Sequence, residues 1–206
     1  MRARSPARTT TPPARLITLA TVRRALRGHP PRTIEAPGSE PAAVALLLVP
    51  DSTGLAALFI HRAERAGDPW SGQIALPGGR REPADKDLLA TAIRETREET
   101  GVDLGPAELL GALDDLHPRT PSLPPVLVRP FVFALPGRPA LAPSPEVQRA
   151  FWLPLAALAK PGAYSEVTVT VRGTAFKVPG YQVADELIWG LTERIVTPFL
   201  RLAGLL

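Results

Sequence analysis

The sequence of 206 residues contains no cysteine, which excludes disulfide bonds and thiolate metal sites. This absence is compatible with a reducing compartment. Lysine is scarce as well, because only Lys86, Lys160 and Lys177 occur and arginine supplies the other basic residues. The formal charge of +4 raises the question of nucleic-acid binding, but no basic helix with interleaved aromatic residues is present. A compositional bias is the simpler explanation, and no nucleic-acid partner is expected.

The sequence also lacks a long apolar run, so neither a secretory signal nor a membrane span is predicted. No acidic residue precedes Glu35, and residues 1–15 contain almost nothing that a core would bury. We therefore expect a disordered Arg/Pro/Thr-rich tail at 1–15. An Arg-rich, acid-free leader resembles an organelle transit peptide, but a bacterial protein of biased composition has the same pattern. The second interpretation is favoured, and a cytoplasmic location is expected, with an organelle matrix as the alternative.

Hydrophobic residues make up 45% of the chain, enough for the core of one domain at residues 41–206. Residues 16–40 are predicted to form an amphipathic helix and a linker, with the helix ending before Pro30-Pro31. Alternating or continuous apolar runs predict the strands, which are residues 42–49, 55–61, 108–113, 126–135, 167–171 and 176–178. Pro130 predicts a bulge or an edge position in its strand. A last helix is predicted over residues 186–205, kinked or broken at Pro198.

The stretch of residues 76–102 contains the strongest local pattern. Apolar and small residues at helical spacing predict a buried helix face, formed by Leu89, Ala92, Ile93, Thr96 and Thr100. Asp85 or Asp87 is suited to cap the start of this helix, and Gly101 is suited to the left-handed residue after its end.

Three carboxylates on this helix share one face, because Glu95, Glu98 and Glu99 stand at i, i+3 and i+4. Like charges at this spacing repel one another, and a divalent cation such as Mg²⁺ or Mn²⁺ removes the conflict. Arg94 and Arg97 flank the cluster and can pair with it or grip a phosphate. The alternative is a solvated helix with ordinary Glu/Arg pairs. The adjacent Pro-Gly-Gly loop, which can bring its backbone close to a ligand, favours the metal site.

This loop and helix resemble the Nudix box of hydrolases that cleave a diphosphate linked to another moiety. The matching residues are Gly79, Arg94, Glu95, Glu98, Glu99, Gly101 and Val102. The resemblance implies an α/β fold, the Nudix α/β/α sandwich with a mixed β-sheet. It also implies Mg²⁺ or Mn²⁺ as cofactor, bound by Gly79, Glu95, Glu98 and Glu99, with Glu146 as a further candidate ligand. The early acid of the motif, which braces it, falls on Asp85 counted forward from Gly79 and on Lys86 counted back from Arg94.

Three further segments resemble the coenzyme A diphosphatase branch of the superfamily. These segments are residues 58–63 (LFIHRA), 72–79 (GQIALPGG) and 188–192 (IWGLT). The resemblance implies substrate contacts from Arg62, Arg65, Gly78, Gly79 and Arg80. Two nearby residues have open interpretations. Trp70 either plugs its loop against the core or stacks on a base, and His117 is either an ordinary loop residue or a phosphate contact or base.

The implied reaction is Mg²⁺-dependent hydrolysis of coenzyme A or acyl-coenzyme A to 3′,5′-ADP and 4′-phosphopantetheine. The catalytic candidates are Glu95, Glu98 and Arg94, in which Arg94 orients the carboxylates and Glu95 or Glu146 takes the proton from water. The net positive charge suits such a small polyphosphate partner. The alternatives are a Nudix pyrophosphatase for ADP-ribose, NADH or an oxidised dNTP, and a non-catalytic Nudix binding domain. The oligomeric state is left open, a homodimer included.

Overall fold

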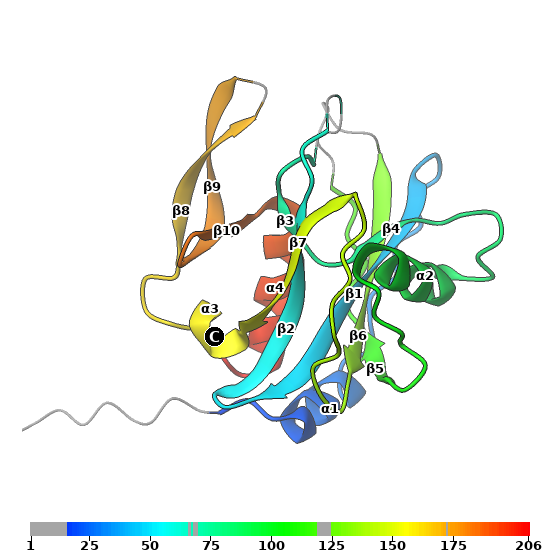
Figure 1. Cartoon of the computed structure of the whole chain (residues 1–206), viewed down its shortest axis with the longest axis vertical. Helices are drawn as coiled ribbons and strands as arrows, with labels where there is room; N and C mark the ends of the chain where they lie inside the picture. The colour runs from blue at the N-terminus through cyan, green and yellow to red at the C-terminus, as the bar shows by residue number, and fades with distance from the viewer. Residues whose placement is uncertain (1–15, 66, 68–69, 119–124, 172) are drawn as a thin grey trace, which may run out of the picture.

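A computed structural model describes residues 16–65, 67, 70–118, 125–171 and 173–206 (Figure 1). The predicted disordered tail at 1–15 lies outside these residues. Within the described part of the chain, no helix is long and apolar enough to cross a membrane.

A mixed sheet is built around strand β1 (Glu40–Asp51), which contains the continuous apolar run. Strand β2 (Gly54–Arg62) returns antiparallel to β1, and β6 (Val126–Ala134) runs parallel to it on the other side. The order is β3-β2-β1-β6-β5, with β4 also paired to β1 and β7 to β2. The remaining strands are β3 (Ile74–Ala75), β4 (Gly78–Arg80), β5 (Glu108–Ala112) and β7 (Val147–Pro154).

Helices cover both faces of this sheet (Figure 1). Successive β1 side chains point to opposite faces, so Leu46 and Leu48 join one core cluster while Ala45 and Leu47 join another. The first cluster contains residues of α1 (Leu19–Arg27), α3 (Leu155–Leu158) and α4 (Gly190–Leu202). The second contains Ala92 of α2 (Leu88–Thr100). This arrangement of helices on both faces of a mixed sheet agrees with the predicted fold class.

A second, three-stranded antiparallel sheet extends beyond the main one, formed by β8 (Tyr164–Val171), β9 (Thr174–Val183) and β10 (Glu186–Trp189) (Figure 1). A partly buried polar cluster ties it to α4. The Tyr164 hydroxyl donates to Glu193 at 3.0 Å, and Thr197 donates to the same carboxylate at 2.8 Å. The hairpin therefore has a fixed attachment to the helix beneath it.

The predicted helix over residues 186–205 was wrong for its first four residues. Residues 186–189 pair with β9 as a strand, and the helix begins only at Gly190, whose φ of 67° turns the chain. Pro198 does not break α4, which continues to Leu202. Buried Val196 and Phe199 on either side of the proline hold the helix against the sheet.

The position of Pro130 also differs from the prediction, because β6 lies inside the sheet and its register with β1 is continuous through the proline. The irregularity lies instead in the neighbouring strand, between Leu109 and Gly111. The β5 ladder with β6 ends at Phe131, and the next bridge on that side involves Val128. The proline therefore lies just past the end of this ladder, where its carbonyl still accepts a hydrogen bond from the Leu113 N–H at 2.9 Å and its missing N–H costs little.

Candidate active site

Helix α2 begins and ends as its sequence indicates. The Asp87 side chain caps the first turn by accepting a hydrogen bond from the Ala90 N–H at 2.8 Å. At the other end, Gly101 adopts a φ of 73° and its N–H donates to the Arg97 carbonyl at 2.9 Å. Of the two proposed caps, Asp87 is therefore the one used, which leaves Asp85 for another role.

The buried face of α2 is rotated relative to the predicted one. Ala92, Thr96 and Thr100 are fully buried as expected, but Ile93 is 38% exposed. Small residues face β1 and β4, and this composition lets the helix backbone approach the sheet closely. As a result, Glu99 is only 4% exposed.

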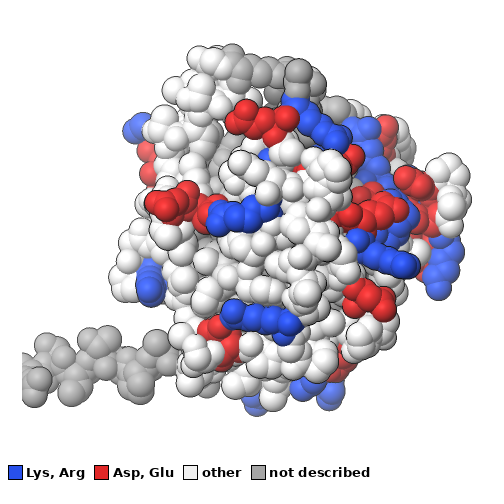
Figure 2. All heavy atoms as spheres, viewed as in Figure 1, with Lys and Arg blue, Asp and Glu red and all other residues white. Residues whose placement is uncertain are grey.

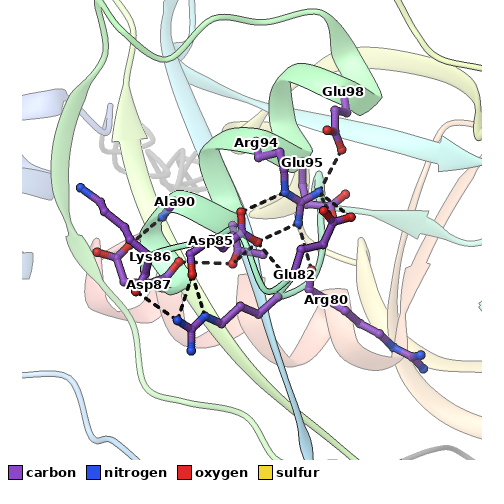
Figure 3. Close-up of polar contacts among 11 residues, drawn as sticks. Arg80, Glu82, Asp85, Lys86, Asp87, Ala90, Arg94, Glu95 and Glu98 are labelled. Atoms are coloured by element: carbon purple, nitrogen blue, oxygen red, sulfur yellow. Dashed lines mark hydrogen bonds and ion pairs between the residues drawn. The ribbon is translucent and has the colours of Figure 1, made fainter.

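Asp85 is the buried brace of the site (Figure 3). Its carboxylate accepts two hydrogen bonds from the Arg94 guanidinium, from Nε at 3.0 Å and from Nη2 at 2.9 Å. The Thr91 hydroxyl and the Glu82 N–H each donate to it at 2.9 Å. The bidentate pair with Arg94 holds the pKa of Asp85 far below its usual range, despite the opposing effect of burial. This geometry agrees with counting the motif forward from the glycines.

Arg94 links the brace to the carboxylates of α2. Its Nη1 donates to Glu95 and to Glu98, both at 2.9 Å, and the close-up shows its guanidinium between Asp85 and these two glutamates (Figure 3). The hydrogen bonds to Asp85 raise the pKa of Arg94, so it stays charged. A charged, immobilised guanidinium of this kind orients the carboxylates that it touches.

Glu95 and Glu99 are carboxylates held in a desolvated position. Burial raises the pKa of Glu95, and the adjacent Arg94 offsets part of that shift. Burial raises the pKa of Glu99 to about 7, although the Gly78 N–H donates to it at 2.8 Å and Arg62 lies 3.7 Å away. The positive charge of the nearby side chains therefore does not fully compensate these two acids.

Both acids line one cavity of about 550 Å³. The other charged residues in its wall are Arg62, Arg80 and Glu146, and its backbone wall includes Gly78 and Gly79 of β4. A Cβ placed on Gly79 would lie 2.4 Å from Oε1 of Glu95, so only glycine leaves room for that carboxylate against the strand. Trp70 also lines the cavity.

Two other predicted site residues, Glu98 and Arg65, are not part of this cavity wall, whereas Arg80 and Glu146 belong to it. Glu98 is exposed and its side chain is directed to Arg94 (Figure 3). Arg65 forms an ion pair with Glu146 at 3.0 Å, and Arg80 forms one with Glu40 at 2.8 Å and extends away from Arg94 (Figure 3). Glu146 precedes β7, so the alternative of a helix-start glutamate does not apply to it.

His117 is occupied by a structural contact. Its Nε2 lies 2.9 Å from the Ser39 hydroxyl, and it does not belong to the cavity wall described above. The adjoining segment 119–124 lies outside the described residues. The ordinary interpretation of this histidine therefore fits the described geometry better than a role in phosphate binding.

Sequence reasoning missed the apolar part of the cavity wall, which consists of Ala42, Val44, Ala75, Leu76, Val126, Val128 and Leu191. The residues at 42, 44, 126 and 128 look like ordinary core positions in the sequence. Their two-residue spacing identifies one face of each strand, but it does not reveal that a cavity opens on that face.

The donor set of this cavity suits a hard divalent cation. Three glutamates and a glycine backbone offer oxygen atoms of the kind that such a cation prefers, and two of the acids are buried without full compensation by positive charge. In the described residues, no three acidic or histidine side chains converge as a ready-made metal site. On the surface, acidic and basic side chains gather over α2 (Figure 2). Metal binding at Gly79, Glu95, Glu98, Glu99 and Glu146 stays a prediction.

Comparisons with known proteins agree with this fold. The NUDIX domain matches residues 39–170 of the chain. A Nudix hydrolase named NudL from Photorhabdus laumondii is 35% identical over 140 residues, which cover 68% of this chain and 73% of the relative. The human mitochondrial coenzyme A diphosphatase NUDT8 is 33% identical over 180 residues, covering 86% of this chain and 74% of the relative.

A solved structure shows the same fold at lower identity. A MutT/nudix family protein from Enterococcus faecalis superimposes with a TM-score of 0.54 at 20% identity, covering 91% of this chain and 75% of the other. The fold and the box residues define a hydrolase that acts on pyrophosphate bonds. The chain belongs to the NUDIX family.

Proposed function

We propose that this Nudix hydrolase cleaves the diphosphate of coenzyme A or acyl-coenzyme A, giving 3′,5′-ADP and 4′-phosphopantetheine. The observation that supports this most is the convergence of the three coenzyme A-like segments on one cavity. Arg62, Gln73 and Leu191, one from each segment, line the cavity that also contains Glu95 and Glu99. The similarity to the human coenzyme A diphosphatase NUDT8 supports the same substrate.

The residues of the cavity have different proposed roles in substrate binding and hydrolysis, according to their charge and burial. Arg62 and Arg80 place positive charge in the wall where a diphosphate would bind, and the Gly78-Gly79 backbone permits a close approach. Arg94 fixes the orientation of Glu95 and is itself fixed by Asp85. Glu95 or Glu146 would accept the proton of the attacking water. A divalent cation, when bound, would neutralise charge on the diphosphate and lower the pKa of water.

A product assay with purified protein and Mg²⁺ tests this proposal. Coenzyme A, ADP-ribose, NADH and 8-oxo-dGTP are offered separately at one concentration, and products are separated by chromatography. We expect preferred release of 3′,5′-ADP from coenzyme A. Preferred cleavage of another substrate would replace coenzyme A by that nucleotide, and no cleavage of any would support a binding domain instead.

The Glu98→Gln variant tests the role of the exposed glutamate. Its side chain is 58% exposed, so the substitution should leave the fold intact. We expect a loss of roughly 10²-fold in rate, comparable to the removal of a key electrostatic stabiliser. Glu82→Gln, a change at a glutamate that is also exposed and near Arg94, serves as the matched control. Full Mg²⁺-dependent activity of Glu98→Gln would remove Glu98 from the proposed metal site.

A further inference from the structure

The cavity that contains Glu95 and Glu99 also has an apolar wall, and the proposed hydrolysis assigns no role to this wall. This wall begins beside the glycine loop, because Val44 on β1 pairs with Gly78 on β4. It continues to β6, where Val128 pairs with Ala42 in the parallel register. Ala42, Val44, Val126 and Val128 all line the cavity, in agreement with the alternation of side chains along the two strands. The apolar surface thus adjoins the proposed diphosphate position.

Helix α4 contributes to the same wall from a segment beyond the matched NUDIX domain. Its residues Leu191 and Thr192 line the cavity, whereas the domain match ends at residue 170. The Thr192 hydroxyl already donates to the Ile74 carbonyl at 2.9 Å. Leu191 packs against the cluster formed by Ala42, Val126 and Val128. The IWGLT segment therefore supplies an apolar contact together with a hydroxyl that is already hydrogen-bonded.

The polarity of this wall restricts what it can bind. Among the described residues that line the cavity, those from β6 and α4 include no charged side chain. A ligand group rich in hydroxyls would lose its hydrogen bonds to water there and gain few in return. An uncharged alkyl group would gain free energy from the burial of its surface. The wall therefore favours a diphosphate substrate whose next atoms are aliphatic.

We propose that Val44, Val128 and Leu191 form a specificity site for a branched alkyl group adjacent to the diphosphate. This inference rests on the proposed function, since it assigns a recognition site to the same cavity. The pantetheine arm fits this description, because the carbon atom next to its phosphate ester methylene carries two methyl groups. In ADP-ribose the corresponding carbon belongs to the ribose ring, which carries a ring oxygen and hydroxyl groups instead of two methyl groups. The wall would thereby separate the two substrate classes.

Binding of two small phosphates to the Leu191→Asn variant tests the proposal. The ligands are 4′-phosphopantetheine and ribose 5-phosphate, titrated with Mg²⁺ present and followed by NMR. We expect Leu191→Asn to bind 4′-phosphopantetheine about 10-fold more weakly than the wild type, the lower end of the range for lost apolar contacts in a pocket. Binding of ribose 5-phosphate should not weaken. Leu202→Asn, at a partly buried position near the other end of α4, is the matched control for damage to the helix.

A second substitution guards against misfolding of the first. Val44→Thr is nearly isosteric and places a hydroxyl in the wall, so it should weaken 4′-phosphopantetheine binding selectively as well. Equal weakening of both ligands, or no weakening of either, would overturn the inference. So would a wild type that does not bind 4′-phosphopantetheine.

The outcomes for the two proposals can be distinguished. A wild type that binds 4′-phosphopantetheine in a Leu191-dependent manner but does not cleave coenzyme A would overturn only the proposed reaction. A wild type that cleaves coenzyme A, with Leu191→Asn and Val44→Thr unchanged in ligand binding, would overturn only the specificity site.

Discussion

Asp85 acts on the site through the arginine that it holds. Its carboxylate is 6% exposed and makes a bidentate contact with Arg94, which in turn reaches Glu95 and Glu98. A buried charge in this position is stable only while its partner is present. The position of the carboxylates of α2 therefore depends on a side chain that does not line the cavity.

The Asp85→Asn variant should lose both stability and activity. The amide keeps the size of the side chain but removes the charge, so Arg94 loses its principal partner and its orientation. We expect the free energy of unfolding to fall by about 3 kcal/mol, as when one member of a buried pair is removed. Urea denaturation measures this loss, and kcat in the product assay measures the effect on Glu95.

Glu82→Gln provides the control for Asp85→Asn. The Glu82 side chain is 61% exposed and lies 3.7 Å from Arg94, where solvent weakens the interaction. Its removal should change the free energy of unfolding by less than about 1 kcal/mol. Equal destabilisation by the two variants would contradict the assignment of Asp85 as the brace.

At the scale of the elements, the short strand β4 brings two glycines between α2 and β1. The two glycines differ in what a side chain would meet. A Cβ on Gly78 would lie 2.3 Å from the backbone carbonyl of Ala43, and the φ of Gly78 is 152°. A Cβ on Gly79 would instead meet the carboxylate of Glu95, the mobile end of a side chain. Gly78 is thus required by the fold and Gly79 by the site.

The Gly79→Ala variant should therefore fold normally and lose activity. The added methyl group displaces the Glu95 carboxylate without straining the backbone, and a displacement of about 1 Å in a catalytic group can cost roughly 10²-fold in rate. Thermal denaturation and kcat measured on the same preparation separate the two effects. Gly137→Ala, where nothing lies within 4 Å of the new Cβ, is the matched control. A Gly79→Ala enzyme with full activity would show that Glu95 works from another position.

Local signals in the sequence predicted most of these elements correctly. The helix cap, predicted at Asp85 or Asp87, the left-handed Gly101 and the buried run of β1 depend on backbone conformation and continuous apolar character, which neighbouring residues determine. The exposed Ile93 and the start of α4 at Gly190 depend on tertiary contacts instead. Residues 186–189 became a strand because β9 offered a pairing edge, which periodicity alone cannot show.

The same division applies to the candidate site. The box residues could be identified from their order in the sequence, but the directions in which their side chains point could not. Glu95 and Glu99 face the cavity, whereas Glu98 pairs with Arg94 at the surface, although all three share a helix face. The contribution of Leu191 could not be derived either. It depends on α4 packing against Ala42 of β1, which lies more than a hundred residues earlier in the chain.

At the scale of the whole molecule, the charged form of Glu99 is electrostatically unfavourable in the metal-free protein. Burial raises the pKa of Glu99 from 4.5 to about 7, so the folded protein binds this proton more tightly than the unfolded chain does. A raised carboxyl pKa stabilises the fold at low pH, and this contribution is lost as pH rises through the folded-state value. The Glu99 contribution to the stability of the metal-free protein should therefore fall between about pH 4.5 and pH 7. Asp85, with its lowered pKa, has the opposite effect, which is confined to more acidic solutions.

The Glu99→Gln variant and Mg²⁺ together test this account. For the metal-free wild type, the Glu99 contribution to the free energy of unfolding should decrease by about 3 kcal/mol over this range, and Glu99→Gln should lack that decrease. Mg²⁺ binds the ionised carboxylate, so it should raise the Tm of the wild type more at pH 8 than at pH 5.5. Glu98→Gln, a change at an exposed carboxylate on the same helix, should keep the pH dependence of the metal-free wild type. Denaturation of all three proteins in EDTA and in Mg²⁺ at both pH values measures these effects. If Glu99→Gln shows the same slope as the wild type, the unfavourable charge must lie elsewhere in the molecule.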